Sequence, residues 1–191
     1  SSSLHPWVAL VALLALVQGW GGDVPTKLIS VENGGPWGDW GDIEFCPRGS
    51  YAIGFQLKVE APRGFFGDDT GLNGIRLICN DNMGMATSSE GPRGTWSYLV
   101  SCSRGHRLTS FRLRVEAPRG LWDDTAANSL DATCSDGMLL EGMGGPAGVW
   151  GNWSIPCPPG WGVCGLRTRV EPPQRAGDDT GLNSAEFFCC I

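Results

Sequence analysis

The stretch FQLKVEAP at 55–62 returns twice in this chain, as FRLRVEAP at 111–118 and LRTRVEPP at 166–173. Apolar and polar residues alternate through each copy, which is the period of two expected of a strand with one buried face. The alternation begins just before each quoted stretch, and we expect its apolar side chains to face a core. In the first copy these positions are Ile53, Phe55, Leu57 and Val59.

A turn signal and a second strand follow each of these stretches. The segment GDDTGLN occurs at 67–73 and again at 177–183, and its relative WDDTAAN occurs at 122–128. Pro, Gly and Asp are residues that turns prefer, and the segment GIRLIC at 74–79 alternates again. Beyond the first 22 residues no segment sustains an apolar period of 3.6, so the sequence predicts an all-β fold.

Cysteines and tryptophans recur in register with these strands, so the chain consists of three repeats of about 55 residues. We expect one domain at 23–191, with repeats at approximately 28–82, 83–138 and 139–191. Three equivalent β units suggest three sheets around one pseudo-threefold axis, as in a β-prism.

The tryptophans divide into repeated and unrepeated positions. Trp40 and Trp96 are equivalent, and we assign Trp153 to the same place in the third copy. Because these positions repeat, core packing is favoured over stacking on a ligand. Trp122 and Trp161 do not repeat, and they are the candidates for a ligand-facing role. The tryptophans expected in the core are Trp37, Trp40, Trp96, Trp150 and Trp153.

An apolar run near the start of the chain predicts secretion. Residues 7–17 contain no polar residue, and these eleven are too few to span a bilayer, which needs about 20. They fit the hydrophobic region of a signal peptide better than a buried N-terminal helix. We expect residues 1–22 to be removed and the mature protein to be soluble, monomeric and extracellular.

Eight cysteines in an exported chain predict disulfides. If each repeat closes on itself, the pairs are Cys46–Cys79, Cys102–Cys134 and Cys157–Cys189, with Cys164 and Cys190 left to pair. An exchange of partners between the neighbours Cys189 and Cys190 stays open. Zinc is the alternative, but the chain has no CxxC pair and the mature part has one histidine, His106, which we interpret as a surface residue. We expect no metal and no cofactor.

The charge balance argues against two classes of binding partner. The net charge is −6 and no basic cluster occurs, which argues against nucleic acid or an anionic membrane as a partner.

Paired aspartates are the candidates for catalysis or calcium binding. We favour a structural role, in which one Asp of each pair fixes the turn through its backbone amides. A glycosidase needs two carboxylates about 5–5.5 Å or 6.5–9.5 Å apart, so aspartates from different repeats would have to meet near the axis. Calcium would suit the same cluster of hard oxygen ligands. The candidates are Asp68, Asp69, Asp123, Asp124, Asp178 and Asp179.

Glu60, Glu116 and Glu171 recur at the end of the first strand of each copy. We expect them to pair with strand arginines or to lie at the rim, and a shared acidic cleft is the alternative. Separately, Asn152 begins the glycosylation sequon Asn-Trp-Ser, for which we expect partial or no occupancy because a large residue stands in the middle.

Six motifs of the chain identify a family resemblance. They are GGPWGDW at 34–40, LKVEAP at 57–62, GDDTGLN, GIRLIC at 74–79, DDTAAN in the middle copy and the closing FFCC. Together they resemble the vitelline membrane outer layer protein 1 family, and the resemblance covers the whole mature chain. The middle copy departs from the pattern, because Trp122 replaces the glycine of the other copies and Arg93 stands at the place of Trp37.

The resemblance implies a β-prism of three Greek-key sheets, four disulfides and secretion into an extracellular coat or fluid. Coat or matrix proteins and glycans are the implied partners. Because the repeats form a symmetric scaffold without an asymmetric catalytic constellation, we expect a non-enzymatic protein that binds glycans. The alternative is an enzyme acting on N-acetylglucosamine oligosaccharides, lysozyme-like or transferase-like, with carboxylates from different repeats as acid and base.

Overall fold

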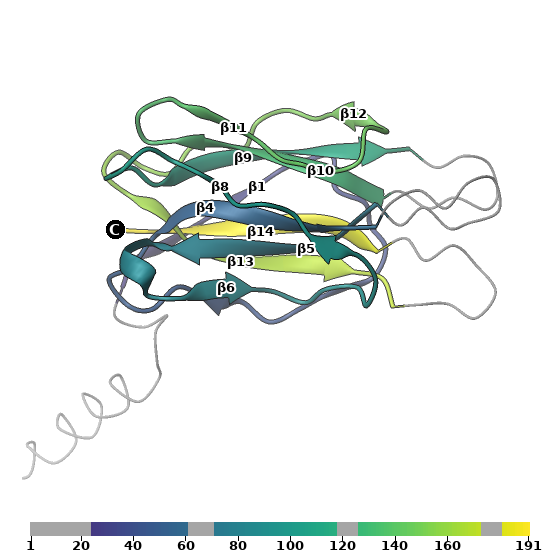
Figure 1. The fold of residues 1–191 in the computed structure, drawn as a ribbon, viewed down its shortest axis with the longest axis horizontal. Coiled ribbons are helices and arrows are strands. Elements are labelled where there is room, and N and C mark those ends of the chain that lie inside the picture. Colours follow the sequence, from purple (N-terminus) through teal and green to yellow (C-terminus); the bar gives the residue numbers. More distant parts are fainter. Residues whose placement is uncertain (1–23, 61–70, 118–125, 173–180) are drawn as a thin grey trace, which may run out of the picture.

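The computed structural model describes residues 24–60, 71–117, 126–172 and 181–191 (Figure 1). Three antiparallel sheets pack around one axis as a β-prism, and one short 3₁₀ turn at Asn80–Asn82 is the helical part of the described residues. The expected all-β fold is confirmed. The six candidate aspartates, Trp122 and the expected signal peptide lie outside the described residues.

The first two sheets are Greek keys with the same strand order. In each, three strands follow one another as hairpins, and the fourth returns beside the first. One sheet has the order β6-β5-β4-β7, and the other has the order β11-β10-β9-β12. Their strands are β4 (Ala52–Val59), β5 (Leu72–Cys79), β6 (Met85–Thr87), β7 (Thr95–Trp96) and β8 (Val100–Ser101), which also pairs with β4, and then β9 (Leu108–Glu116), β10 (Ala126–Cys134), β11 (Leu139–Glu141) and β12 (Val149–Trp150).

The third sheet joins the two ends of the chain. Its order is β1-β14-β13-β2, with β3 also pairing with β13. This is the same Greek key when the chain is read as a circle, because the N-terminal strands follow the C-terminal hairpin in space. The strands are β13 (Gly162–Val170), β14 (Leu182–Cys190), β1 (Thr26–Ser30), β2 (Asp39–Trp40) and β3 (Glu44–Phe45).

The strand register corrects one predicted equivalence. Each strand tryptophan lies opposite the same position of a hairpin strand: Trp40 opposite Arg169, Trp96 opposite Lys58 and Trp150 opposite Arg114. The third equivalent is therefore Trp150, and the assignment of Trp153 was wrong. The error arose because the segment from Trp150 to Cys157 is one residue longer than its counterparts.

A β-bulge corrects the predicted alternation at the start of β4. The pairing with β5 shifts register between Ala52 and Gly54, which places the extra residue at Ile53. Ala52 is fully buried, whereas Ile53 is half-exposed. The prediction that Ile53 faces the core was wrong because the bulge reverses the alternation there, and equivalent shifts occur in the other two sheets.

The core fills the axis with unequal side chains at equivalent places. In the layer where the sheets meet, the cross-strand pairs are Phe55 with Leu77, Phe111 with Ala132 and Leu166 with Phe187. All six side chains are fully buried. The small Ala132 leaves room for the Phe187 ring, which stacks on Phe111 with 4.2 Å between the ring centroids. One full aromatic stack thus ties two sheets together.

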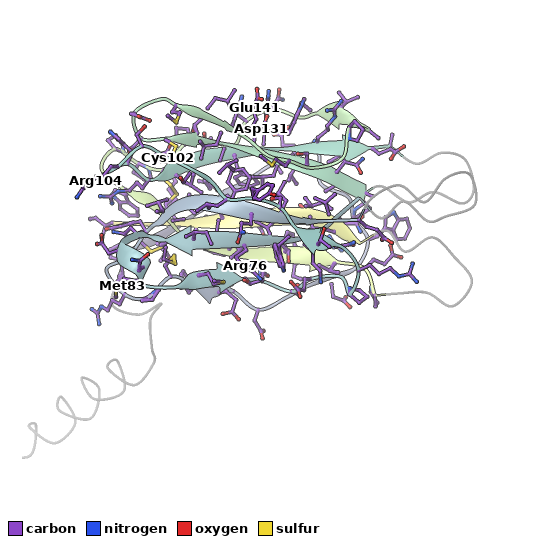
Figure 2. The ribbon with its side chains drawn as sticks, viewed as in Figure 1. Arg76, Met83, Cys102, Arg104, Asp131 and Glu141 are labelled. Carbon is purple, nitrogen blue, oxygen red and sulfur yellow. A yellow bond between two sulfur atoms is a disulfide. The ribbon has the colours of Figure 1, made fainter. Side chains whose placement is uncertain are left out.

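Four disulfides lie at one end of the prism. They join Cys46 to Cys79, Cys102 to Cys134, Cys157 to Cys189 and Cys164 to Cys190. This end, where β4, β9 and β13 begin, is called the cysteine end below. Figure 2 shows Cys102 and Arg104 there. The opposite end, where these strands reach Glu60, Glu116 and Glu171, is called the glutamate end.

The aromatic stack makes a direct stability prediction, with a matched neighbour as control. We expect Phe187→Ala to lower the free energy of unfolding by about 3–5 kcal/mol, because it empties a buried space beside Phe111. Phe188→Ala removes the same atoms from a partly exposed ring, so its cost is smaller. Urea unfolding with intact disulfides measures both, and equal costs would contradict this account of the core.

Two glycines with positive φ separate the cost of a steric collision from the cost of an unfavourable backbone conformation. Gly38 and Gly49 both have positive φ, at 88° and 84°. A Cβ on Gly38 would lie 2.4 Å from the backbone oxygen of Val170, whereas one on Gly49 would meet nothing within 4 Å. We expect Gly49→Ala to cost about 1–2 kcal/mol from the conformation alone. Gly38→Ala should cost about 1–3 kcal/mol more because β2 is pushed from β13, and thermal denaturation should rank the two variants in this order.

Candidate functional site

The predicted site residues are divided between the two ends of the prism. Strand β4 has eight residues and strands β9 and β13 have nine each, so the two ends lie about 26–30 Å apart at 3.3 Å per residue. The three candidate glutamates are at the glutamate end, and Trp161 is at the cysteine end, just before β13. One small ligand cannot touch both groups.

Two of the three glutamates at the glutamate end are almost fully buried. Glu60 and Glu171 are 6% and 7% exposed, and their backbone N–H groups donate to the carbonyls of Gly71 and Gly181, both at 2.9 Å. Glu116 is half-buried, with the Asn128 amide 3.5 Å from its carboxylate. Burial of this kind keeps a carboxylate away from a bulky sugar.

Asparagines of the repeated turn motif hold a second loop in place. Asn73 is 2% exposed, and its side-chain amide donates to the backbone carbonyl of Arg93 at 2.9 Å. The backbone carbonyl of Asn73 accepts from the N–H of Gly91 at 2.7 Å. The same pattern recurs in the middle sheet. There Asn128 donates to Ala147 at 3.0 Å and accepts from Gly145 at 2.8 Å. Each asparagine is therefore a latch for the Gly-Pro loop that precedes the tryptophan strand.

The tryptophans expected in the core lie outside it, and four of the five stack on arginines of the strands. Trp40, Trp96 and Trp150 are half-exposed, while Trp37 and Trp153 are 47% and 37% exposed. The prediction of core packing was wrong because these side chains cover the outer sheet faces, where strand arginines provide cation–π partners. The guanidinium-to-ring distances are 3.9 Å for Arg76 on Trp96, 4.5 Å for Arg112 on Trp150 and 4.8 Å for Arg167 on Trp40.

Two acidic residues that sequence reasoning missed complete this outer layer. Arg112 donates to Asp131 at 2.8 and 3.0 Å, and Arg167 pairs with Glu186. Figure 2 shows Asp131 on the sheet that contains β9, β10 and β11. The alternation of β10 and β14 already placed both acids on the outward face, which was the available signal. Their partners depended on the strand register.

A cleft opens at the cysteine end beside Trp161. It has a volume of about 550 Å³ and lies between three segments that are distant in the sequence, at 105–109, 133–137 and 156–161. Trp161 is half-buried, and its backbone N–H donates to Pro158. The cleft fits the size range of small-molecule sites, about 300–1,000 Å³. Trp122, the other unrepeated tryptophan, is outside the described residues.

Arg107 belongs to this cleft and was not singled out in the sequence. Its guanidinium lies 3.8 Å from the centre of the Tyr51 ring, and its aliphatic stem lies where a Cβ of Gly162 would be. Tyr51, Arg107 and Gly162 occupy one place of the repeat. Unlike residues at an otherwise repeated place are the same signal that drew attention to Trp161.

Polar neighbours of the cleft are held by hydrogen bonds. Ser135 accepts the backbone N–H of Arg107 at 3.2 Å, and its hydroxyl lies 3.0 Å from Nδ1 of His106. The other ring nitrogen of His106 is 4.0 Å from Asp136. His106 is half-buried beside this loop.

The glycosylation sequon has one exposed and one buried polar side chain. Asn152 is exposed, but the Ser154 hydroxyl is buried and accepts the N–H of Phe111 at 3.1 Å.

Among the described residues, no group of three or more His, Cys, Asp or Glu side chains is arranged to hold a metal ion. The part of the chain that the structure describes contains no helix long and apolar enough to cross a membrane.

The family model of vitelline membrane outer layer protein I matches residues 27–191. The chain belongs to this family. It is 50% identical over 170 residues to the human vitelline membrane outer layer protein 1 homolog, with 86% of this chain and 83% of the human protein covered. The mouse homolog is 45% identical over 169 residues, with the same coverage.

Solved structures with similar folds include lectins. The Calsepa lectin in complex with a biantennary N-glycan has a TM-score of 0.58 at 12% identity and covers 86% of this chain and 96% of its own. Frutapin, a lectin from Artocarpus incisa, has a TM-score of 0.56 at 15% identity and covers 87% and 97%. At these identities the likeness shows the fold alone, and jacalin-related lectins of this group are β-prisms.

The asparagine latch yields a test of its structural role. We expect Asn73→Asp to lower the free energy of unfolding by about 1–3 kcal/mol, because it replaces the buried donor to the Arg93 carbonyl with an acceptor. Asn82→Asp makes the same chemical change at an exposed residue and should have little effect. If thermal denaturation shows equal midpoints for the two variants, the latch contributes no stability.

Proposed function

We propose that this chain is a secreted, non-enzymatic component of an extracellular coat or fluid and that it binds glycans as a monomer. The observation that carries the proposal is membership of the vitelline membrane outer layer family across residues 27–191. The family name refers to an extracellular layer, and coat or matrix proteins are the corresponding partners. The cleft beside Trp161 supports the glycan-binding part of the proposal.

Secretion is supported by the sulfur chemistry. All eight cysteines are paired, and their Cα atoms are 5.7–5.8 Å apart, within the usual range for a disulfide. Disulfides of this density persist in oxidising compartments and are rare in the cytosol. The apolar run at 7–17 fits the signal that would direct the chain there.

Glycan binding is supported by the cleft at the cysteine end. Its lining includes a tryptophan and prolines together with hydroxyl groups and an arginine. A sugar ring has a matching apolar face and polar edge. The similar lectin structures include complexes with mannose and with an N-glycan, and the shared fold makes a carbohydrate ligand a reasonable inference here.

A non-enzymatic role is supported by the glutamate end. Two of its three glutamates are almost fully buried, and the neighbouring asparagines serve as latches. The rival enzyme would need two carboxylates facing one sugar, with an open gap between them. No arrangement of the described residues favours it.

A paired assay tests this proposal. The mature chain, produced in secreting cells, is applied to a glycan array and separately incubated with N-acetylglucosamine oligomers. We expect recovery in the medium with four disulfides, binding to a subset of glycans and unchanged oligomers. Array signals at background would contradict the glycan part, and cleavage or transfer of the oligomers would contradict the non-enzymatic role.

A further inference from the structure

We infer that the cleft beside Trp161 binds an acidic saccharide, a pyranose that carries a carboxylate. The ring would stack on Trp161, the carboxylate would pair with Arg107, and hydroxyls would reach the threonines and Ser135. This inference rests on the proposed glycan-binding function and names the site and the sugar class within it. It places the ligand at the cysteine end, far from the repeated carboxylates.

One wall of the cleft is apolar and rigid. It is formed by Pro156, Cys157, Pro158, Pro159 and Trp161. The disulfide to Cys189 anchors this segment, and Trp161 packs against the edge of the hydrophobic core. A fixed indole beside prolines is a stacking surface that loses little conformational entropy on binding.

Another part of the cleft lining is polar and also fixed. Thr109 and Thr133 lie on neighbouring strands with their hydroxyl oxygens 3.1 Å apart. Ser135 is held by the backbone N–H of Arg107. These hydroxyls can donate to and accept from the hydroxyls of a sugar. The two walls together therefore match a ring that is apolar on one face and polar at its edge.

Arg107 adds charge selectivity to the polar wall. The other arginines on the strands contact polar groups, for example Arg112 with Asp131, Arg167 with Glu186 and Arg169 with the Gly38 carbonyl. Within the described residues the Arg107 guanidinium has the Tyr51 ring as its contact and no acidic partner within 4.0 Å. Stacking on Tyr51 fixes the plane of the guanidinium and leaves its N–H edge open for a ligand.

The charges around the cleft favour a carboxylate over a neutral sugar. Arg107 is the one charged residue among the described residues that line the cleft, although the whole chain carries a net charge of −6. A planar guanidinium and a carboxylate form two parallel hydrogen bonds, which are stronger than hydrogen bonds between neutral groups.

The test compares sialyllactose with lactose, which differ by the acidic sugar. Saturation-transfer NMR and calorimetry with the full mature chain should show sialyllactose binding at least tenfold more tightly than lactose. Binding should weaken as salt rises from about 0.05 to 0.5 M, because an exposed ion pair is screened. Equal affinities, or no salt dependence, would overturn the inference without any variant being made.

Variants then locate the site. We expect Arg107→Gln to lower the affinity for sialyllactose by roughly tenfold to a hundredfold, and Trp161→Ala to lower it by a similar factor. Arg107→Lys keeps the charge and loses the paired geometry, so it should fall between wild type and Arg107→Gln. Arg104→Gln removes an exposed arginine at the same end that does not line the cleft, and it should bind as wild type does.

The outcomes separate this inference from the proposed function. Glycan binding that survives both Arg107→Gln and Trp161→Ala overturns the cleft as the site and leaves glycan binding standing. Binding to no glycan at all overturns both. Thermal denaturation of each variant confirms folding, and if Trp161→Ala unfolds, Trp161→Phe keeps a stacking ring and should retain most of the affinity.

Discussion

The stack of Phe187 on Phe111 shows how three sheets meet at one axis with unlike side chains at equivalent places. Here the pairs are Phe with Leu, Phe with Ala and Leu with Phe, so that the alanine of one sheet accommodates the ring of another. The same solution recurs at the cysteine end, where a tyrosine, an arginine and a glycine meet. Departure from symmetry is thus part of how this core packs, and unrepeated residues also line the cleft.

The repeats are bound to one another by exchange of strands. Each tryptophan strand pairs with the hairpin of the preceding repeat, as Trp96 on β7 does with Lys58 on β4. Buried asparagines at the glutamate end then hold the loop that leads into each of these strands, and disulfides staple the other end. The outer faces carry tryptophan, arginine and acidic side chains in contact, which shields the sheets without adding to the core. Structural demands thus account for most of the repeated motifs.

The sequence allowed prediction of those features of the fold that depend on periodic or local patterns of residues. Alternation with a period of two, turn residues and the register of cysteines were enough to predict an all-β prism with four disulfides. The exposure of Trp40, Trp96 and Trp150 could not be predicted, because repetition shows that positions are equivalent and does not show which face they occupy. The bulge at Ile53 and the pairing of Arg112 with Asp131 depend on the register between strands. The cleft is assembled from three segments far apart in the chain, so the break in the repeat at Trp161 and at Arg107 could be seen in the sequence, while their meeting in one cleft could not.

Closure of the third sheet has a consequence for how the molecule is made. Strands β1, β2 and β3 pair with β13 and β14, which are synthesised after the other described strands. Strands β1, β2 and β3 therefore wait without these partners until β13 and β14 have been made, while the other two sheets can form earlier. Contacts between opposite ends of a chain are slow to form because a long loop must close first. The order of synthesis thus makes the N-terminal strands the last to dock, and a truncated chain would expose an open edge of β13 and β14.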